Sequence, residues 1–325
     1  MRLLKLVLPI ALLAYFVLAY VEPEAFVALV EKTAFPAVIA YFTCLLAARW
    51  LQALQTRIAL SSTGVEVGAV EVFRAQLVAT FYTMFVPGDL VGGGVTWYLL
   101  KRARRAGAII AMVLVYLRLV FLALAIPFVI LGLVLETRMH SASLLAALAI
   151  ASAATVVATL PLVFRPAARV AGKLIAAVST CFGGRAPGIQ TALATVRECI
   201  ATCASASTRA TCAVFALALA QHLLGAVGLW LAAEAAQANV PFQAFLWVWP
   251  LMIVVHMLPL SFGGLGVREL TLIYVLNTLY ATTAESVLLL SMITLLATTV
   301  LGLAGGLWNS FLAVKPEQNA GQRSE

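Results

Sequence analysis

Residues Phe85–Arg102 have the sequence FVPGDLVGGGVTWYLLKR, and this stretch interrupts an apolar region, Ala75–Leu100. Pro87 and the glycines that follow it favour a break in a helix, because proline lacks a backbone donor and glycine favours turns. Ala75–Val86 contains 12 residues, which form a helix of only about 18 Å. The hydrocarbon core of a bilayer is about 30 Å thick. The stretch therefore predicts a re-entrant hairpin.

A second interruption has the same character. The apolar region Phe245–Tyr280 breaks at residues 259–266, PLSFGGLG, and its return arm Val267–Tyr280 is short. Trp247 and Trp249 indicate that the region begins at an interfacial level. We expect a second re-entrant hairpin here, entering from the opposite side of the membrane. A pair of full spans in either region keeps the same topology and stays open as an alternative.

The composition is that of a polytopic membrane protein. The 325-residue chain has 63% hydrophobic and 10% charged residues, whereas soluble domains average roughly 45–50% and about 25%. This balance excludes a soluble enzyme, a disordered chain and a secreted disulfide scaffold. We expect an all-α fold with two broken hairpins and six full spans. The spans are Leu3–Val21, Ala34–Leu54, Ala106–Leu135, Leu144–Phe164, Ala210–Ala233 and Val287–Val314.

The lysines and arginines predict the orientation. With the N-terminus in the cytoplasm, 17 of the 21 cations lie on the cytoplasmic side, including Arg49, Arg57 and Arg74. This excess follows the positive-inside rule. It predicts a multi-pass protein of the cytoplasmic (inner) membrane with both termini in the cytoplasm. A basic cytoplasmic loop, residues 165–209, is either an ordinary positive-inside loop or an amphipathic segment on an anionic leaflet.

The order of these segments predicts an internal repeat. We expect one integral membrane domain, residues 1–314, and a cytoplasmic tail, residues 315–325. The halves, about residues 1–137 and 138–314, would each contain two spans, a hairpin and a third span, in opposite orientations. Broken helices of such inverted repeats meet near the bilayer midplane and form a binding site there. Simple kinking of packed helices by glycine and proline is the alternative.

The candidate substrate-binding residues are the embedded charges and the prolines and glycines of the two breaks. An embedded charge costs at least about 2.5–3.5 kcal/mol at the bilayer centre unless it is paired or hydrated. Arginine binds phosphate through two parallel hydrogen bonds, and glycines leave backbone N–H groups accessible to an anion. A structural ion-pair network and close helix packing are the alternatives. The set is Pro87, Gly88, Asp89, Gly92, Gly93, Gly94, Arg118, Pro259, Gly263, Gly264, Gly266, Arg268 and Glu269.

Nothing in the sequence indicates catalysis. It contains no HExxH, GxSxG, Walker loop or paired Cys/His set. We therefore expect no enzyme, no cofactor and no metal site. His222 and His256 are expected to be satisfied core residues, with a proton relay as the alternative.

The segment LPLSFGGLGVREL, Leu258–Leu270, resembles the signature of the lysylphosphatidylglycerol synthase transmembrane, or flippase-like, family. The matching residues are Pro259, Gly263, Gly264, Gly266, Arg268 and Glu269. The first break resembles the partner motif through Pro87-Gly88 and Gly92-Gly93. It has Gly94 and Thr96 where the family commonly has an acidic residue and an arginine. The resemblance covers roughly residues 3–314 and implies that a lipid moves between leaflets. Because only residues 315–325 follow the last span, we expect a stand-alone member without the soluble synthase domain.

The resemblance implies a lipid transporter for a polar-headgroup lipid, either a modified phospholipid or a polyprenyl-phosphate conjugate. One alternative is a membrane-embedded lipid-modifying enzyme that uses Asp89 or Glu269 as acid or base. Another is a non-transporting partner of a lipid or glycan biosynthetic complex. The expected partners are the lipid substrate and an anionic lipid surface on the cytoplasmic side. A homo-oligomer or a biosynthetic partner protein stays open, and no nucleic acid is expected.

Overall fold

The computed structural model describes residues 22–84, 90–102, 106–135, 142–181, 187–256 and 267–313. Every regular element in these residues is an α-helix. The helices are α2 (Pro23–Glu31), α3 (Phe35–Ser61), α4 (Ala69–Thr83), α5 (Leu90–Arg102), α6 (Gly107–Leu135), α7 (Ala142–Val163), α8 (Arg165–Cys181), α9 (Pro187–Ala204), α10 (Thr208–Ala235), α11 (Phe242–His256), α12 (Val267–Tyr280) and α13 (Ala284–Ala313). The predicted span Leu3–Val21 and the predicted tail lie outside the described residues.

Within the described residues, four helices are long and apolar enough to cross a membrane: α3, α6, α10 and α13. The bent pair of α7 and α8 is a fifth candidate. Large apolar side chains are exposed on the outer faces, such as Ile39, Val157 and Leu296. Such surfaces require lipid, because water would penalise exposed apolar area of this extent. The chain is an integral, multi-pass membrane protein.

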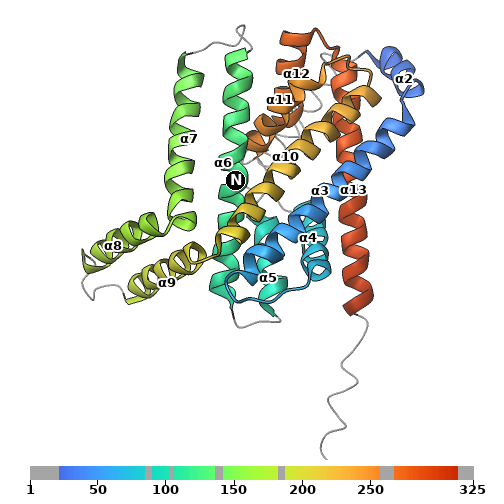
Figure 1. Cartoon of the computed structure of the whole chain (residues 1–325). Helices are drawn as coiled ribbons and strands as arrows, with labels where there is room; N and C mark the ends of the chain where they lie inside the picture. The colour runs from blue at the N-terminus through green and yellow to red at the C-terminus, as the bar shows by residue number, and fades with distance from the viewer. Residues whose placement is uncertain are drawn as a thin grey trace, which may run out of the picture.

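Helices α3 and α10 form the centre of the bundle and run diagonally across it side by side (Figure 1). They are antiparallel, since Tyr41 near the start of α3 packs on Gly228 near the end of α10. At the opposite end Gln55 Nε2 donates to the carbonyl oxygen of Val214 at 2.9 Å. A Cβ atom at position 228 would lie 3.3 Å from the Tyr41 ring, so glycine permits this close crossing.

Two pairs of short helices lie at opposite ends of the bundle: α4–α5 at the lower end of Figure 1 and α11–α12 at the upper end. The four helices have 13 to 15 residues each, or about 20–22 Å. None reaches the roughly 30 Å of a hydrocarbon core. Helix α4 packs against α13, and α11 packs against α6.

Glycines set both of these contacts. A Cβ atom at Gly305 of α13 would overlap the backbone of Leu77 in α4. A Cβ atom at Gly132 of α6 would likewise overlap the Trp247 side chain of α11. Small residues at helix interfaces in membranes let the backbones approach closely. Close contacts at glycine therefore hold α4 against α13, and α11 against α6.

Two sequence expectations about element boundaries were wrong. Helix α3 continues to Ser61 beyond the predicted end at Leu54, because its polar residues find partners inside the bundle. Gly92, Gly93 and Gly94 do not form part of the break, since they lie in the first turns of α5. The predicted basic loop 165–209 contains two helices, α8 and α9, which agrees with the amphipathic segment that was one of its two interpretations.

Helix α9 carries two buried thiols, Cys199 and Cys203. Burial raises the pKa of Cys203 to about 11, and neighbouring Cys199 adds to this shift. At pH 8 the reactive thiolate is thus roughly one thousandth of the Cys203 population. We predict that peptide-resolved alkylation at pH 8 modifies the exposed Cys212 of α10 and leaves Cys203 intact. Equal modification of both residues would show that α9 is not packed as described.

Candidate functional site

Two arginines lie at the middle depth of the bundle. Arg49 precedes the end of α3 by 12 residues, and Arg118 follows the start of α6 by 11. Both of these helix ends are at the lower end of Figure 1. At about 1.5 Å per residue, the arginines are roughly 16–18 Å from that end along their helices, which is an upper limit on the depth of Arg49 because α3 is tilted (Figure 1). This depth is close to the centre of a hydrocarbon layer about 30 Å thick.

The two guanidinium groups are close enough that their charges interact unfavourably. Arg49 Nη1 donates to Gln52 Oε1 at 3.2 Å. None of the carboxylates in the described residues forms an ion pair with Arg49. Two neighbouring arginines can together bind one phosphate or carboxylate through bidentate hydrogen bonds. The pair therefore has the chemistry of a phosphate or carboxylate site.

Arg49 belongs to a polar stripe on α3. Arg49, Gln52 and Thr56 follow one another at intervals of three and four residues, which places them on one face of the helix. Gln76 of α4 donates to Thr56 Oγ1 at 3.3 Å, while its own Oε1 atom is buried without a partner. A buried acceptor left without a partner costs about 1–3 kcal/mol. Gln76 thus adds an available acceptor to the stripe.

A second set of hydrogen bonds joins this region to α10. Gln221 Nε2 donates to Gln55 Oε1 at 3.0 Å, and both side chains are buried. His222 is 2% exposed, stacks on the Phe121 ring at 4.1 Å and has its Nε2 2.8 Å from the Phe121 carbonyl oxygen. That distance requires an Nε2–H donor, so Nδ1 is the unpartnered atom. We call Arg49, Gln52, Gln55, Thr56, Gln76, Arg118, Gln221 and His222 the polar layer.

The N-terminal end of α5 lies at the same depth. Leu90 precedes Arg102 at the lower end by 12 residues, about 18 Å along the helix. A helix N-terminus carries partial positive charge and unpaired backbone N–H groups. Gly93 and Gly94 are exposed, and no atom of the described residues lies within 4 Å of where their Cβ atoms would be. Packing against the described residues therefore does not explain these two glycines, whereas a Cβ atom at Gly92 would lie 3.2 Å from Thr83 Cγ2.

Of the predicted site residues, the structure brings Arg118 and the start of α5 to the same depth. Arg268 and Glu269 lie in the first turn of α12, and their side chains fall outside the description. The remaining predicted residues also lie outside the described residues: Pro87, Gly88, Asp89, Pro259, Gly263, Gly264 and Gly266. The predicted pairing of the four embedded charges stays a prediction.

The positive-inside rule predicts a cytoplasmic Arg49, and in the structure Arg49 lies 12 residues before the end of α3. The hydropathy of α3 falls after Leu54, which predicts that the span ends close to Arg49. The spacing of Arg49, Gln52 and Thr56 could have shown that Arg49 lies inside a longer helix. These residues share one helical face, and apolar residues 58–60 follow them.

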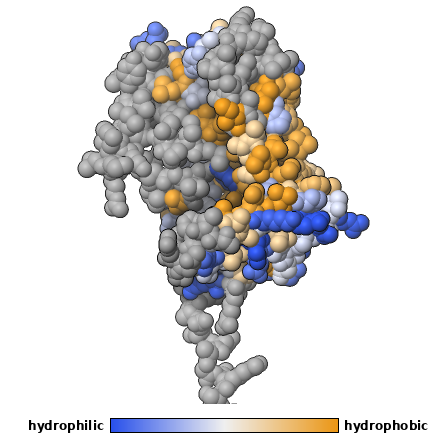
Figure 2. All heavy atoms as spheres, turned by 90° about the vertical axis from the view of Figure 1, so that its left-hand side faces the viewer, coloured by the Kyte–Doolittle hydropathy of each residue, from blue (hydrophilic) through white to orange (hydrophobic). Residues whose placement is uncertain are grey.

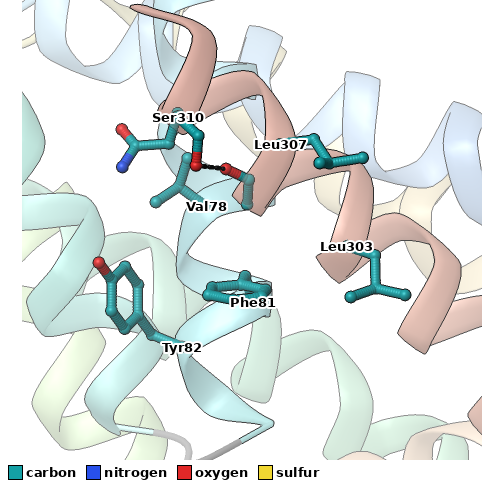
Figure 3. A pocket seen from close by; sticks show the side chains of 8 residues that line it. Val78, Phe81, Tyr82, Leu303, Leu307 and Ser310 are labelled. Atoms are coloured by element: carbon teal, nitrogen blue, oxygen red, sulfur yellow. Dashed lines mark hydrogen bonds between the residues drawn. The ribbon is translucent and has the colours of Figure 1, made fainter. Parts of the chain in front are cut away.

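A shallow cavity of about 220 Å³ lies between α4 and α13 (Figure 3). Val78, Phe81, Leu303 and Leu307 give it apolar walls, and Tyr82, Asn309 and Ser310 add polar groups to its lining. Ser310 Oγ donates to the Gly306 carbonyl oxygen at 3.0 Å. The cavity is separate from the polar layer, and its lining suits an apolar chain.

The helices define a class of protein: an integral, multi-pass α-helical membrane protein with a polar layer at its centre. The profile of one family, the lysylphosphatidylglycerol synthase TM region, matches residues 2–306. The chain belongs to this family, whose name links it to lipid metabolism or transport. No curated protein and no solved structure matches the chain.

Proposed function

We propose that the protein is a flippase-like transporter that moves a lipid with a phosphate-containing headgroup between leaflets, without chemical modification of the lipid. A modified phospholipid and a polyprenyl-phosphate conjugate share this chemistry. The observation that carries the proposal is the pair Arg49 and Arg118, two cations that interact at the middle depth of the bundle. The family supports a role in lipid metabolism or transport.

In this proposal the phosphate lies between the two guanidinium groups and next to the N-terminal end of α5. Both arginines can donate bidentate hydrogen bonds to phosphate oxygens. The described residues leave space beside Gly93 and Gly94, where the rest of the headgroup would lie. The acyl or prenyl chains remain in lipid, and the cavity between α4 and α13 can accommodate part of one chain.

We further propose an inverted repeat in which α3, α4, α5 and α6 correspond to α10, α11, α12 and α13. The packing of α4 on α13 supports this correspondence, since the equivalent pair α11 and α6 also packs together. The antiparallel pair of α3 and α10 would then lie on the pseudo-twofold axis. Rocking of one half against the other would expose the polar layer to each side in turn.

The proposed orientation places the α4–α5 end in the cytoplasm, in a cytoplasmic (inner) membrane. The helix ends and helices at that end carry exposed Arg57 (α3), Arg102 (α5), Arg169 (α8) and Arg209 (α10), with Glu66 after α3. The opposite helix ends carry exposed Glu22, Glu24, Glu31 and Glu234, with Lys32 after α2. This distribution is the one expected from the positive-inside rule.

The direct test reconstitutes the purified protein in vesicles that contain a fluorescent lipid, and measures the fraction accessible to an added reductant over time. We predict a protein-dependent increase for lipids with an anionic phosphate headgroup. A labelled glycolipid without phosphate serves as the control and should remain at the rate of empty vesicles. Equal rates for the two lipids, or no increase for any lipid, would contradict the proposal.

A further inference from the structure

Helix α8 leaves the bundle at a steep angle. Its axis, over Arg165–Ser179, makes an angle of 102° with the preceding helical segment Ala153–Val163. In Figure 1 α8 and α9 extend sideways from the lower end of α7. If α7 is roughly perpendicular to the membrane, α8 lies close to the plane of the membrane surface.

Two different stripes share the exposed surface of α8. Val170, Leu174 and Val178 are 59%, 62% and 47% exposed and follow one another every four residues. Arg169 and Lys173 are also exposed, and each precedes one of these apolar residues. Successive residues are about 100° apart around a helix, so a cationic stripe runs beside the apolar stripe. In the coloured part of the face that Figure 2 shows, hydrophilic side chains gather below an apolar band.

Helix α9 holds α8 in this position. The aliphatic part of Arg197 in α9 packs against Gly172 in α8. A Cβ atom added at Gly172 would lie 3.6 Å from Arg197 Cγ. Arg165 Nε and Nη2 donate to the carbonyl oxygens of Ala204 and Ser205 at 3.4 and 3.3 Å, which satisfies groups at the end of α9. Cys203 packs in the core cluster with Tyr116 of α6. Arg165 is therefore engaged within the protein, and Arg169 and Lys173 are available to a partner.

We propose that α8 is a surface-lying helix that binds the anionic lipids of the leaflet next to it. Its apolar stripe inserts among the acyl chains near the headgroups, and Arg169 and Lys173 bind lipid phosphates. A helix with adjoining apolar and basic faces binds membranes in this way. This interaction is independent of the transport proposed above, because it involves none of the residues of the polar layer.

Charge favours lipid over a second copy of the chain as the occupant. Among the described residues of α8 there are three cations and no carboxylate, so two α8 helices would repel each other. A bilayer with anionic lipids supplies both the apolar layer and the negative charge that the two stripes require.

Hydrogen exchange of the full chain in nanodiscs tests the proposal without reference to transport. Anionic lipids are expected to slow exchange of the α8 amides about 30-fold relative to zwitterionic lipids. This factor corresponds to an attraction of roughly 1 kcal/mol between the anionic surface and each of the two cations, Arg169 and Lys173. The difference should shrink in 0.5 M salt. Peptides from α10 should exchange equally in both nanodiscs.

Three variants make the result specific. R169Q/K173Q is expected to remove the difference between the two lipid compositions, while R57Q, a charge removed from an exposed position of α3, should retain it. V170S/L174S should lose protection in both compositions. Equal exchange of wild-type α8 in the two nanodiscs would overturn the proposal. Protection that depends on protein concentration, and not on lipid charge, would indicate a second copy as the occupant and would overturn it as well.

Discussion

Replacement of Arg49 by alanine is expected to lower the transport rate of a phosphate-headgroup lipid roughly 10- to 100-fold. A hydrogen bond to a charged group contributes about 1.5–3 kcal/mol, and each 1.4 kcal/mol corresponds to a factor of ten. Arg118→Ala should have an effect of similar size. If both arginines bind one phosphate, the double variant should lose less than the product of the single losses. Initial rates in reconstituted vesicles, normalised to protein content, provide the measurement.

Arg57→Ala is the matched control. Arg57 lies eight residues further along the same helix, and its side chain is exposed outside the polar layer. Its removal should leave transport unchanged. Arg49→Lys keeps the charge and loses the planar fork, so we expect an intermediate rate.

Thermal unfolding separates a binding role of Arg49 from a structural one. Alanine at position 49 removes an embedded charge, which should leave the protein at least as stable as the wild type. A loss of stability with normal transport per folded molecule would show that Arg49 supports the fold instead. Wild-type transport in Arg49→Ala would refute the site.

Replacement of Gly305 by alanine is expected to destabilise the protein by at least about 1–3 kcal/mol. The added Cβ atom would overlap the backbone carbonyl group of Leu77, and a backbone cannot rotate out of the way as a side chain can. Overpacking in tight interiors has costs of this order, and occasionally more. The measurement is the midpoint of thermal unfolding in detergent, for which the fraction of monodisperse protein is recorded at each temperature.

Replacement of Gly94 by alanine should not destabilise the protein, in contrast to the replacement of Gly305. Gly94 lies in a helix, is exposed and has no described neighbour within 4 Å of the added methyl group. Alanine has a higher helix propensity than glycine by about 1 kcal/mol. Gly94→Ala is therefore expected to be neutral or mildly stabilising. Equal stability of the two variants would mean that α4 and α13 are not in contact at Gly305.

Much of the architecture could be predicted from local sequence. The spans Ala106–Leu135 and Ala210–Ala233 agree closely with α6 and α10, because an uninterrupted apolar run has no alternative to a helix in lipid. The two interrupted regions became pairs of short helices, as expected from proline and glycine. The family was also recognisable from its glycine and Arg-Glu signature, and its profile covers residues 2–306.

The polar layer could be predicted only in part. Arg118 was identified because it stands alone within a long apolar run, whereas Arg49 was missed because polar residues follow it. Hydropathy treats every side chain as if it faced lipid. In the folded protein Gln55 bonds to the Val214 carbonyl, and Gln76 of α4 bonds to Thr56. These partners remove the cost of burying polar groups and extend α3 to Ser61.

The sequence by itself determined the membrane class, most of the helices and the end of the molecule at which basic residues accumulate. These properties depend on the hydropathy and charge of neighbouring residues, which the chain carries before it folds. Only the tertiary structure decided that Arg49 and Arg118 are close enough for their charges to interact, and that the apolar and cationic stripes of α8 are both exposed. Both depend on how helices cross and rotate against each other. Glycine contacts between distant segments, such as Gly228 with Tyr41 and Gly305 with Leu77, set that geometry.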